Sequence, residues 1–366
     1  MDVATSAASS ASPAPRPLRV GLIGYGLAGS VFHAPLIAAT DGLVLDTVVT
    51  SSPERQRQAR AEHGEELRTA ADADALFARA DELDLVVVAS PNRTHVELAT
   101  RALEADLAVV VDKPLAATAA EAEALADLAE RRGLLLSVFQ NRRWDSDFLT
   151  LRGLLEEGAL GEVWRFESRF ERWRPQLKGG WRESGDPADV GGLLYDLGSH
   201  LVDQALTLFG PVTSVHAESD ARRPGAETDD DTFIALHHAS GVRSHLWTSA
   251  TAAQLGPRFR VLGSKAAYVK YGLDPQEDAL RAGARPAPGA AWGVEPESAW
   301  GLLGALEDAA PVPSRRGDYP AYYAAVAAAL REGTAPPVTA REAAEALRVL
   351  EAARTSAAEG RTVRLG

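Results

Sequence analysis

The sequence predicts an α/β protein of two domains, in which a doubly wound parallel sheet is followed by an α+β domain with an open, mainly antiparallel sheet. The chain of 366 residues is longer than one ordinary compact core requires. Residues 18–140 alternate short apolar strands with amphipathic helical stretches, which is typical of parallel strands joined by crossover helices. From residue 141 onward strands follow one another with short turns, which indicates hairpins.

The first domain, residues 18–140, is expected to hold five strands with helices between them. The expected strands are 18–23, 43–49, 83–89, 108–111 and 134–139. The expected helices are 31–39, 53–63, 73–80, 94–105 and 119–132.

The second domain, residues 141–366, is expected to begin with a helix over 148–157. Its expected strands are 162–171, 212–218, 232–238, 241–248, 259–262 and 266–271. Helices over 319–332 and 340–358 close the chain. Thr339 with Glu342 three residues later forms a capping box for the last helix, and Gly360 follows its end. Residues 1–17 are mostly small and polar, which predicts a disordered tail.

Composition excludes several classes of protein. A formal net charge of -13 argues against a nucleic-acid partner, because such binding needs clustered cations. The absence of cysteine rules out disulfides and thiolate chemistry, and fits a reducing compartment such as the cytoplasm. No apolar run reaches the roughly 20 residues needed to span a bilayer. We therefore expect a small-molecule partner, with no nucleic acid and no membrane.

Three glycines stand where the first strand passes into a helix. Gly24, Gly26 and Gly29 form G-x-G-x-x-G, the dinucleotide-binding pattern of the Rossmann fold. The first glycine allows a tight turn, the second lets the backbone approach a pyrophosphate, and the third lets helix and strand pack closely. Leu27 and Ala28, inside this turn, are expected to contact the cofactor too. A purely structural turn is the alternative.

The end of the second strand indicates which dinucleotide is bound. An acidic residue there is typical of NAD enzymes, whereas this chain has "VVTSSPERQRQ". Its hydroxyl and guanidinium groups suit a 2'-phosphate and favour NADP(H) over NAD(H). The residues concerned are Thr50, Ser51, Ser52, Arg55 and Arg57. Ser52 could instead serve only to begin a helix, and Asp46 lies inside the strand.

The third strand ends in "ASPNRTH", which places polar groups beside the expected cofactor. These residues are Ser90, Pro91, Asn92 and His95. The beginning of a helix is the competing explanation for them.

Lys113 ends the next buried strand, in "VVVDKP". Ligands of open α/β sheets lie beyond the carboxyl ends of the strands, so the ammonium is expected to point into the cofactor crevice. Pro114 keeps Lys113 extended, and the bond between them could be cis. A lysine on the surface is the alternative.

Asp196 and His200 are four residues apart in "GGLLYDLGSHLVDQAL". If this segment is helical, both side chains lie on one face and the carboxylate can orient the imidazole. A capped, solvated helix would also explain the spacing. No third ligand occurs at a fitting distance, so no metal site is expected.

Two further segments are candidates for contacting a substrate. Asn141 and Arg142 follow the last strand of the first domain and border the same crevice. The loop over 172–192 carries Trp181, which could cover a sugar face. Its other large side chains are Trp173, Arg174 and Arg182. A polar surface loop anchored by two tryptophans is the alternative.

Together, the glycine turn, the Asp-Lys-Pro strand end and the Gly-Gly-x-x-x-Asp-x-Gly-x-His segment resemble the Gfo/Idh/MocA oxidoreductases. The segments "GYGLAGSVFHAPLI", "ESRFERWRP" and "RFRVLGSKAAYVKYGLDPQE" are most similar to the branch that contains NADP-dependent scyllo-inositol dehydrogenases. The resemblance covers the chain from residue 18 onward. Asp112 stands where many members have glutamate.

The resemblance implies that a catalytic set of Lys113, Asp196 and His200 surrounds a reacting hydroxyl of a cyclic polyol or sugar. It further implies a homodimer or homotetramer and an active site between the domains. His200 would exchange the proton, Lys113 would stabilise charge on the oxygen, and Asp196 would orient His200. Alternatives are a sugar–sugar oxidoreductase or NAD-assisted glycosidase that retains its cofactor, and a dinucleotide-sensing regulator without turnover.

Overall fold

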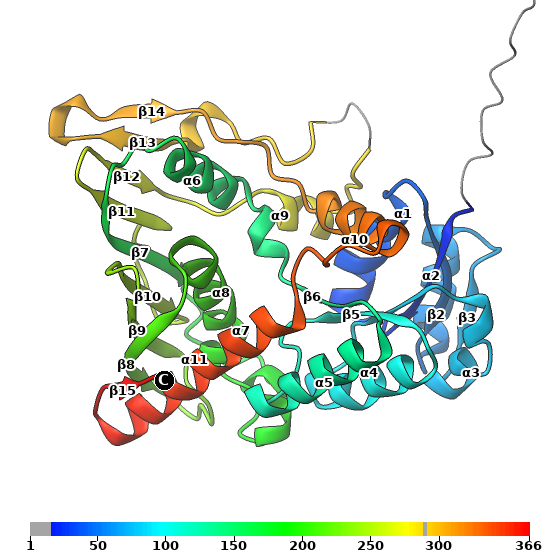
Figure 1. Cartoon of the computed structure of the whole chain (residues 1–366). Helices are drawn as coiled ribbons and strands as arrows, with labels where there is room; N and C mark the ends of the chain where they lie inside the picture. Colours follow the sequence, from blue (N-terminus) through cyan, green and yellow to red (C-terminus); the bar gives the residue numbers. More distant parts are fainter. Residues whose placement is uncertain (1–15, 288–290) are drawn as a thin grey trace, which may run out of the picture.

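The computed structural model describes residues 16–287 and 291–366 of the chain. Most of the expected tail, residues 1–15, lies outside the described residues. The remainder forms two sheets, one at each side of the molecule in Figure 1. The predicted combination of a parallel sheet with a second, mainly antiparallel sheet is confirmed.

The first sheet has six parallel strands in the order β3-β2-β1-β4-β5-β6. Its strands are β1 (Leu18–Ile23), β2 (Leu43–Val49), β3 (Arg68–Ala70), β4 (Leu85–Val88), β5 (Ala108–Asp112) and β6 (Leu136–Phe139). The central strands are buried on both faces, as expected for a sheet covered by crossover helices. Chain order reverses between β1 and β4, so a crevice opens there at the carboxyl ends of the strands.

Helices cover both faces of this sheet, with α1 and α10 above it and α4 and α5 below it in Figure 1. The helices of this half are α1 (Ala34–Ala38), α2 (Pro53–His63), α3 (Ala73–Phe77), α4 (His95–Glu104) and α5 (Ala119–Arg132). The expected helix over 31–39 is instead a π-helical turn, η1 (Ala28–His33), that continues into α1. Strand β3 was not predicted, because three residues are too few to show a periodic pattern.

The second sheet has nine strands in the order β14-β13-β12-β11-β7-β10-β9-β8-β15. Its neighbours are antiparallel apart from the parallel pair β7 and β10. The central strands are β7 (Val163–Glu171), β8 (Val212–Asp220), β9 (Asp231–His238), β10 (Arg243–Ser249), β11 (Phe259–Gly263) and β12 (Ala267–Lys270). The remaining strands are β13 (Gly301–Gly304), β14 (Ala310–Val312) and β15 (Val363–Arg364), of which β14 and β15 form the two edges. The hairpin expected around Ser240-Gly241 joins β9 to β10.

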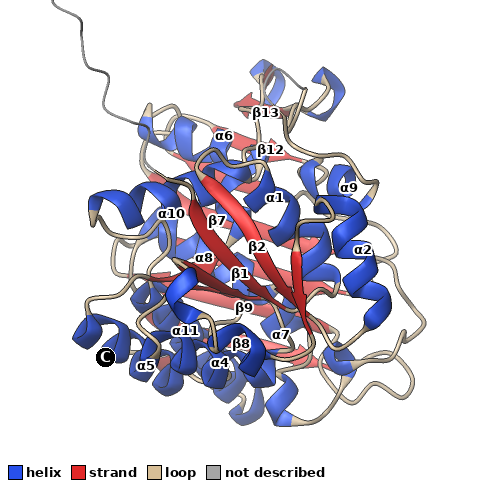
Figure 2. Ribbon diagram, turned by 90° about the vertical axis from the view of Figure 1, so that its right-hand side faces the viewer, coloured by secondary structure: helices blue, strands red, loops and turns tan. Residues whose placement is uncertain are grey.

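One face of this sheet is covered by α8 (Gly198–Phe209) and α11 (Ala340–Glu359), while α6 (Ser146–Glu156) lies near its β12–β14 end (Figures 1 and 2). The short helices α7 (Leu193–Asp196) and α9 (Gln276–Arg281) and the longer α10 (Pro320–Glu332) complete the set. The capping box of Thr339 and Glu342 is present, and Gly360 ends α11 in the left-handed conformation.

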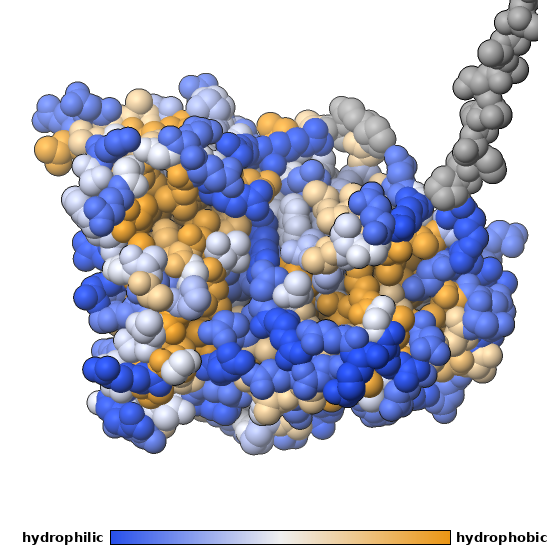
Figure 3. Space-filling view, viewed as in Figure 1, coloured by the Kyte–Doolittle hydropathy of each residue, from blue (hydrophilic) through white to orange (hydrophobic). Residues whose placement is uncertain are grey.

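Helix α11 joins the two halves, because it packs on α5 and β6 of the first and on α8 and β8 of the second. At its start the Ser137 hydroxyl donates to the Val338 carbonyl at 2.8 Å. Where α11 and α5 reach the surface they form a hydrophilic area, with ion pairs such as Arg341–Glu130 (Figure 3). The two sheets are therefore held in one arrangement by a shared helix.

Candidate active site

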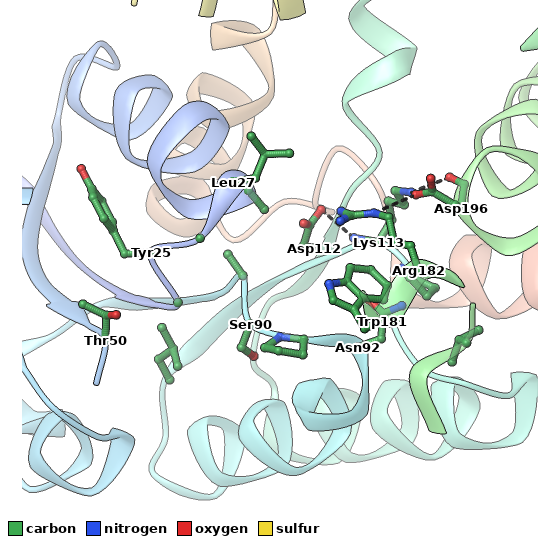
Figure 4. A pocket seen from close by; sticks show the side chains of 18 of the residues that line it. Tyr25, Leu27, Thr50, Ser90, Asn92, Asp112, Lys113, Trp181, Arg182 and Asp196 are labelled. Atoms are coloured by element: carbon green, nitrogen blue, oxygen red, sulfur yellow. Dashed lines mark hydrogen bonds and ion pairs between the residues drawn. The ribbon is translucent and has the colours of Figure 1, made fainter. Parts of the chain in front are cut away.

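A cavity of about 530 Å³ lies at the carboxyl ends of β1, β2, β4 and β5. The predicted residues that line it are Gly24, Gly26, Leu27, Ala28, Thr50, Ser51, Arg55, Ser90, Pro91, Asn92, Lys113, Trp181 and Asp196. Figure 4 shows Tyr25 and Thr50 at one end, and Lys113 with Asp196 at the other. A second cavity of about 700 Å³ shares Leu27, Lys113, Trp181 and Asp196 with the first. The two are therefore contiguous at Lys113 and Asp196.

The three glycines of the turn have three different environments. Gly24 has a φ of 101°, and a Cβ there would lie 2.5 Å from the Ala89 carbonyl oxygen. A Cβ on Gly29 would lie 2.0 Å from the Gly24 carbonyl oxygen, so its close packing requires glycine. A Cβ on Gly26 would meet no atom within 4 Å, and Gly26 lines the cavity. Nothing in the described chain explains the missing side chain at Gly26, whereas a bound pyrophosphate would.

After the end of β2, Ser52 begins helix α2, and the side chain of Arg55 faces the cavity. Ser52 caps α2 by accepting a hydrogen bond from the Arg55 backbone at 3.3 Å, and it does not line the cavity. Thr50, Ser51 and Arg55 do line it. Asp46 forms an ion pair with Arg19 at 2.7 Å and lies away from the cavity. Ser52 therefore has the structural role, and its neighbours face the cavity.

His95, which was predicted to contact the cofactor, lies behind the wall of the cavity. His95 is buried and does not line the cavity. Its Nδ1 lies 2.7 Å from the Pro114 carbonyl oxygen and its Nε2 lies 2.9 Å from the Ser90 carbonyl oxygen. The side chain therefore links the ends of β4 and β5 from behind, and so shapes the cavity without facing it.

Lys113 lies where the two cavities meet, and the Lys113–Pro114 bond is cis. Its ammonium donates to the backbone carbonyl of Asp196 at 2.5 Å and to Oδ1 of the same residue at 3.0 Å. An ammonium has three hydrogen atoms to donate, so one remains for a ligand.

Asp196 is ionised at this junction. Burial alone would raise its pKa, but the cations of Lys113, Arg182 and Arg172 outweigh it and lower the pKa to about 2. Arg182 Nε lies 3.6 Å from Oδ1, and Arg172 approaches Oδ2 at 3.9 Å. The Arg172 Nε atom is buried without a hydrogen-bond partner among the described residues. The Asp196 carboxylate is thus the shared counterion of three cations around the cavity.

Asp196 and His200 do not lie on one continuous helix, which was the condition for the contact expected between them. Helix α7 ends at Asp196, Leu197 breaks the helix, and His200 lies in the first turn of α8. The imidazole consequently forms its hydrogen bond with Gln140, at 3.0 Å between Nδ1 and Oε1, and not with the Asp196 carboxylate. The expectation that Asp196 orients His200 is therefore wrong, although both residues line the larger cavity.

His200 is neutral in this environment. Burial lowers its pKa well below 6.5, and the positive charges of Lys113, Arg142 and Arg258 lower it further. A neutral imidazole can accept a proton, which a protonated one cannot.

The larger cavity also contains the residues expected near a substrate. Asn141 and Arg142, in the 3-10 turn η4 (Asn141–Trp144), line it, and Arg142 forms an ion pair with Glu277. Trp181 and Arg182 of the loop line both cavities, whereas Trp173 lines neither and is exposed.

A contact between the two domains holds the 172–192 loop in place. Arg93, in the 3-10 turn η3 (Asn92–Thr94), donates to Asp189 from Nε at 2.8 Å and lies 3.1 Å from Asp186. Asn92 donates to the Asp189 carbonyl at 3.1 Å. The loop thereby crosses from the second domain to the end of β4, beside the cavity.

Sequence reasoning missed several residues of the site. Gln140, Asp112, Arg172, Phe170 and Tyr195 belong to it. Asp112 and Gln140 immediately precede residues that were predicted, so proximity to a strand end was the available signal. Arg172 and Phe170 come from β7 and the residues after it, which reach the cavity only through the packing of the second sheet.

Comparison with known proteins agrees with this architecture. Residues 18–140 match the model of the oxidoreductase family with an NAD-binding Rossmann fold, Gfo/Idh/MocA. Residues 152–365 match the C-terminal α/β domain of the same family. The chain belongs to the Gfo/Idh/MocA oxidoreductase family.

Individual Gfo/Idh/MocA relatives match over nearly the whole chain. The scyllo-inositol 2-dehydrogenase (NADP(+)) of Bacillus subtilis is 38% identical, with 95% of this chain and 96% of that protein covered. The oxidoreductase YdgJ of Escherichia coli is 45% identical, with 91% and 94% covered. The solved structure of the Bacillus subtilis oxidoreductase yvaA has a TM-score of 0.90 at 36% identity, and covers 96% of this chain and 99% of its own. The family resemblance expected from the motifs is therefore confirmed.

Neither a metal centre nor a membrane span is found in the described part of the chain. Residues 16–287 and 291–366 hold no group of three or more histidine, aspartate or glutamate side chains arranged for a metal ion. The helices described there are all too short or too polar to cross a bilayer.

Proposed function

We propose that this protein is an NADP(H)-dependent dehydrogenase that interconverts a secondary alcohol and a ketone on a cyclic polyol or sugar of the scyllo-inositol type. The observation that carries the proposal is the junction of the two cavities at Lys113 and Asp196, with His200 in the wall of the larger one. A dinucleotide in the smaller cavity and a polyol in the larger would meet beside these side chains. The scyllo-inositol dehydrogenase of Bacillus subtilis supports the substrate class and the cofactor.

The smaller cavity fits a dinucleotide on three counts. Gly26 leaves room where a pyrophosphate would approach, and Ser90, Pro91 and Asn92 form the opposite wall. Arg55, beside the hydroxyls of Thr50 and Ser51, would hold the 2'-phosphate that distinguishes NADP. When bound, the nicotinamide supplies the acceptor for the two electrons and the hydrogen that leave the carbinol carbon as hydride.

The chain's own residues manage the substrate oxygen and its proton. Lys113 forms a hydrogen bond with that oxygen through its remaining N–H group. This hydrogen bond stabilises the negative charge that develops on the oxygen. Neutral His200 accepts the hydroxyl proton during oxidation and returns it during reduction. Asp196 holds the Lys113 ammonium in position through two contacts. Trp181 and Arg182 border both cavities, where they can limit access of water.

We further propose that the protein is cytoplasmic and forms a homodimer or homotetramer through the open face of the second sheet. Phe233 and Trp247 lie on that face with their ring centroids 5.1 Å apart, and the Arg169 guanidinium lies 3.9 Å from the Trp247 ring centroid. Aromatic residues and arginine are enriched in protein interfaces. Light scattering after size-exclusion chromatography gives the subunit number, and a monomer at micromolar concentration would contradict this part of the proposal.

Initial rates of NADP reduction with scyllo-inositol, myo-inositol, glucose and xylose, each repeated with NAD, test the function. We expect saturable turnover with NADP and a cyclic polyol. Tight NADPH binding without turnover of any secondary alcohol or ketone would contradict a dehydrogenase and favour a dinucleotide sensor. Cofactor that survives extensive dialysis would favour a hydride exchange between two sugars.

A further inference from the structure

Gln140 forms the one side-chain hydrogen bond that His200 makes with the described residues. Gln140 directly follows β6 (Leu136–Phe139), and its Oε1 lies 3.0 Å from His200 Nδ1. The two side chains are 4% and 5% exposed, so water competes little for this contact.

An amide oxygen can only accept a hydrogen bond, so the Nδ1 atom that faces it carries a hydrogen. A neutral imidazole has a single N–H, which leaves the lone pair on Nε2. We propose that Gln140 is a positioning residue that fixes the Nδ1–H tautomer of His200 and thereby presents Nε2 to the substrate hydroxyl as the proton acceptor. This inference rests on the proposed function in assigning the proton to His200.

Because of the charges around the imidazole ring, it matters that residue 140 is a neutral glutamine and not a glutamate. The cations that face His200 are Lys113 at the end of β5, Arg142 in η4 and Arg258 before β11, and they disfavour a protonated ring. Each cation has an acidic partner, which is Asp196 for Lys113, Glu277 for Arg142 and Asp147 for Arg258. None of these acids forms a hydrogen bond with the imidazole. A neutral acceptor at position 140 therefore orients the ring without a full negative charge beside it, whereas a carboxylate would also strongly favour the protonated ring.

The proton balance follows from the tautomer. During oxidation the O–H bond of the substrate breaks and an N–H bond forms at Nε2, while a bound nicotinamide would accept the hydrogen of the carbinol carbon together with its bonding electron pair. The ring is then positively charged, and Nδ1–H still donates to Gln140. Reduction returns the proton from Nε2 to the oxygen. Gln140 keeps one hydrogen bond throughout, so the ring need not rotate during turnover.

A spectroscopic test requires neither cofactor nor substrate. In ¹⁵N-histidine-labelled full-length protein, long-range ¹H–¹⁵N correlations distinguish the two neutral tautomers, and the His200→Gln variant identifies the signals of His200. We expect Nδ1 protonated and Nε2 unprotonated at neutral pH. Protonation on Nε2 with a bare Nδ1 would overturn the inference even if the protein proves to be a dehydrogenase.

Substitutions at Gln140 separate positioning from folding. Gln140→Met keeps the volume but removes the acceptor, and we expect loss of the single tautomer and about a tenfold lower kcat with little change in NADPH affinity. Gln140→Glu restores the acceptor and adds charge, so we expect the Nδ1–H tautomer to be retained and the acid limb of the pH–rate profile to move to higher pH. Gln58→Glu, which adds the same charge at an exposed site on α2, should leave that limb unmoved. Gln140→Glu with an unshifted limb, or Gln140→Met with an unchanged tautomer, would refute the role.

Discussion

Replacement of Arg55 by alanine tests how this chain would distinguish NADP from NAD. Arg55 lies in the first turn of α2 and lines the smaller cavity beside Thr50 and Ser51. Its guanidinium has no hydrogen bond or ion pair with the residues that the structure describes. Since the substitution removes no hydrogen bond or ion pair among the described residues, its effect is expected on ligand binding and not on folding.

The expected loss of NADPH binding free energy in Arg55→Ala follows from the exposure of the Arg55 side chain. A hydrogen bond to a charged group contributes about 1.5–3 kcal/mol. Because Arg55 is exposed, screening by solvent favours the lower end of that range. A loss of about 1.5 kcal/mol corresponds to roughly tenfold weaker NADPH binding. NADH lacks the 2'-phosphate, so its affinity should change by less than about twofold.

Titration of tryptophan fluorescence with NADPH and with NADH measures both constants, because Trp181 lies in the cavity wall. Arg57→Ala is the matched control, since Arg57 is an exposed arginine on the same helix that does not line the cavity. Added salt should reduce the preference of the wild-type protein for NADPH and should affect the Arg55→Ala variant less. An unchanged ratio of the two dissociation constants in Arg55→Ala would refute the 2'-phosphate role.

Three further predictions concern the junction and the loop. Lys113→Ala and His200→Ala should each lower kcat by about 100-fold or more while NADPH binding is largely kept, and full activity in either variant would remove that residue from the mechanism. Burial and neighbouring cations lower the pKa of His200 well below 6.5. We therefore expect kcat/KM for alcohol oxidation to be level above pH 6.5 and to fall only below it, as the base becomes protonated. An acid limb with its midpoint at or above pH 6.5 would contradict this prediction. Arg93→Ala removes the ion pairs with Asp189 and Asp186. NADPH should then dissociate about threefold faster, and trypsin should cleave the 172–192 loop sooner. Identical rates in the variant and the wild-type protein would show that the contact does not retain the cofactor.

The sequence predicted those parts of the site that depend on residues close together in the chain. A glycine turn, a cap and a strand end each involve neighbours in the chain, so the spacing alone was enough to place Gly24, Gly26 and Gly29 in the turn after β1. Helices α2 and α5 were predicted with their observed bounds, because Ser52 and Thr118 cap them and Gly64 and Gly133 follow their ends. The short strands β13, β14 and β15 were not predicted, since two to four residues carry no measurable alternation.

The relation between Asp196 and His200 shows why local reasoning fails elsewhere. Spacing of four residues predicts a contact only along an uninterrupted helix, and the turn at Leu197 removes that condition. Each side chain then finds a partner distant in sequence. Asp196 pairs with Lys113, 83 residues away, and His200 bonds with Gln140, 60 residues away. Such partners depend on how the two domains pack, which no periodic pattern encodes.

The packing that sets these partners depends on a buried arginine next to the site. Arg143 donates to Asp203 from Nε at 2.8 Å and from a terminal nitrogen at 2.7 Å, and also donates to Glu342 at 2.9 Å. Asp203 lies on α8 three residues after His200, and Glu342 lies in the first turn of α11. A planar guanidinium bound at both ends of a carboxylate fixes distance and angle together, which an ammonium could not do. The segment that follows Gln140 is thus held against the helix that carries His200, so the alignment of Gln140 with His200 depends on ion pairs within the second domain.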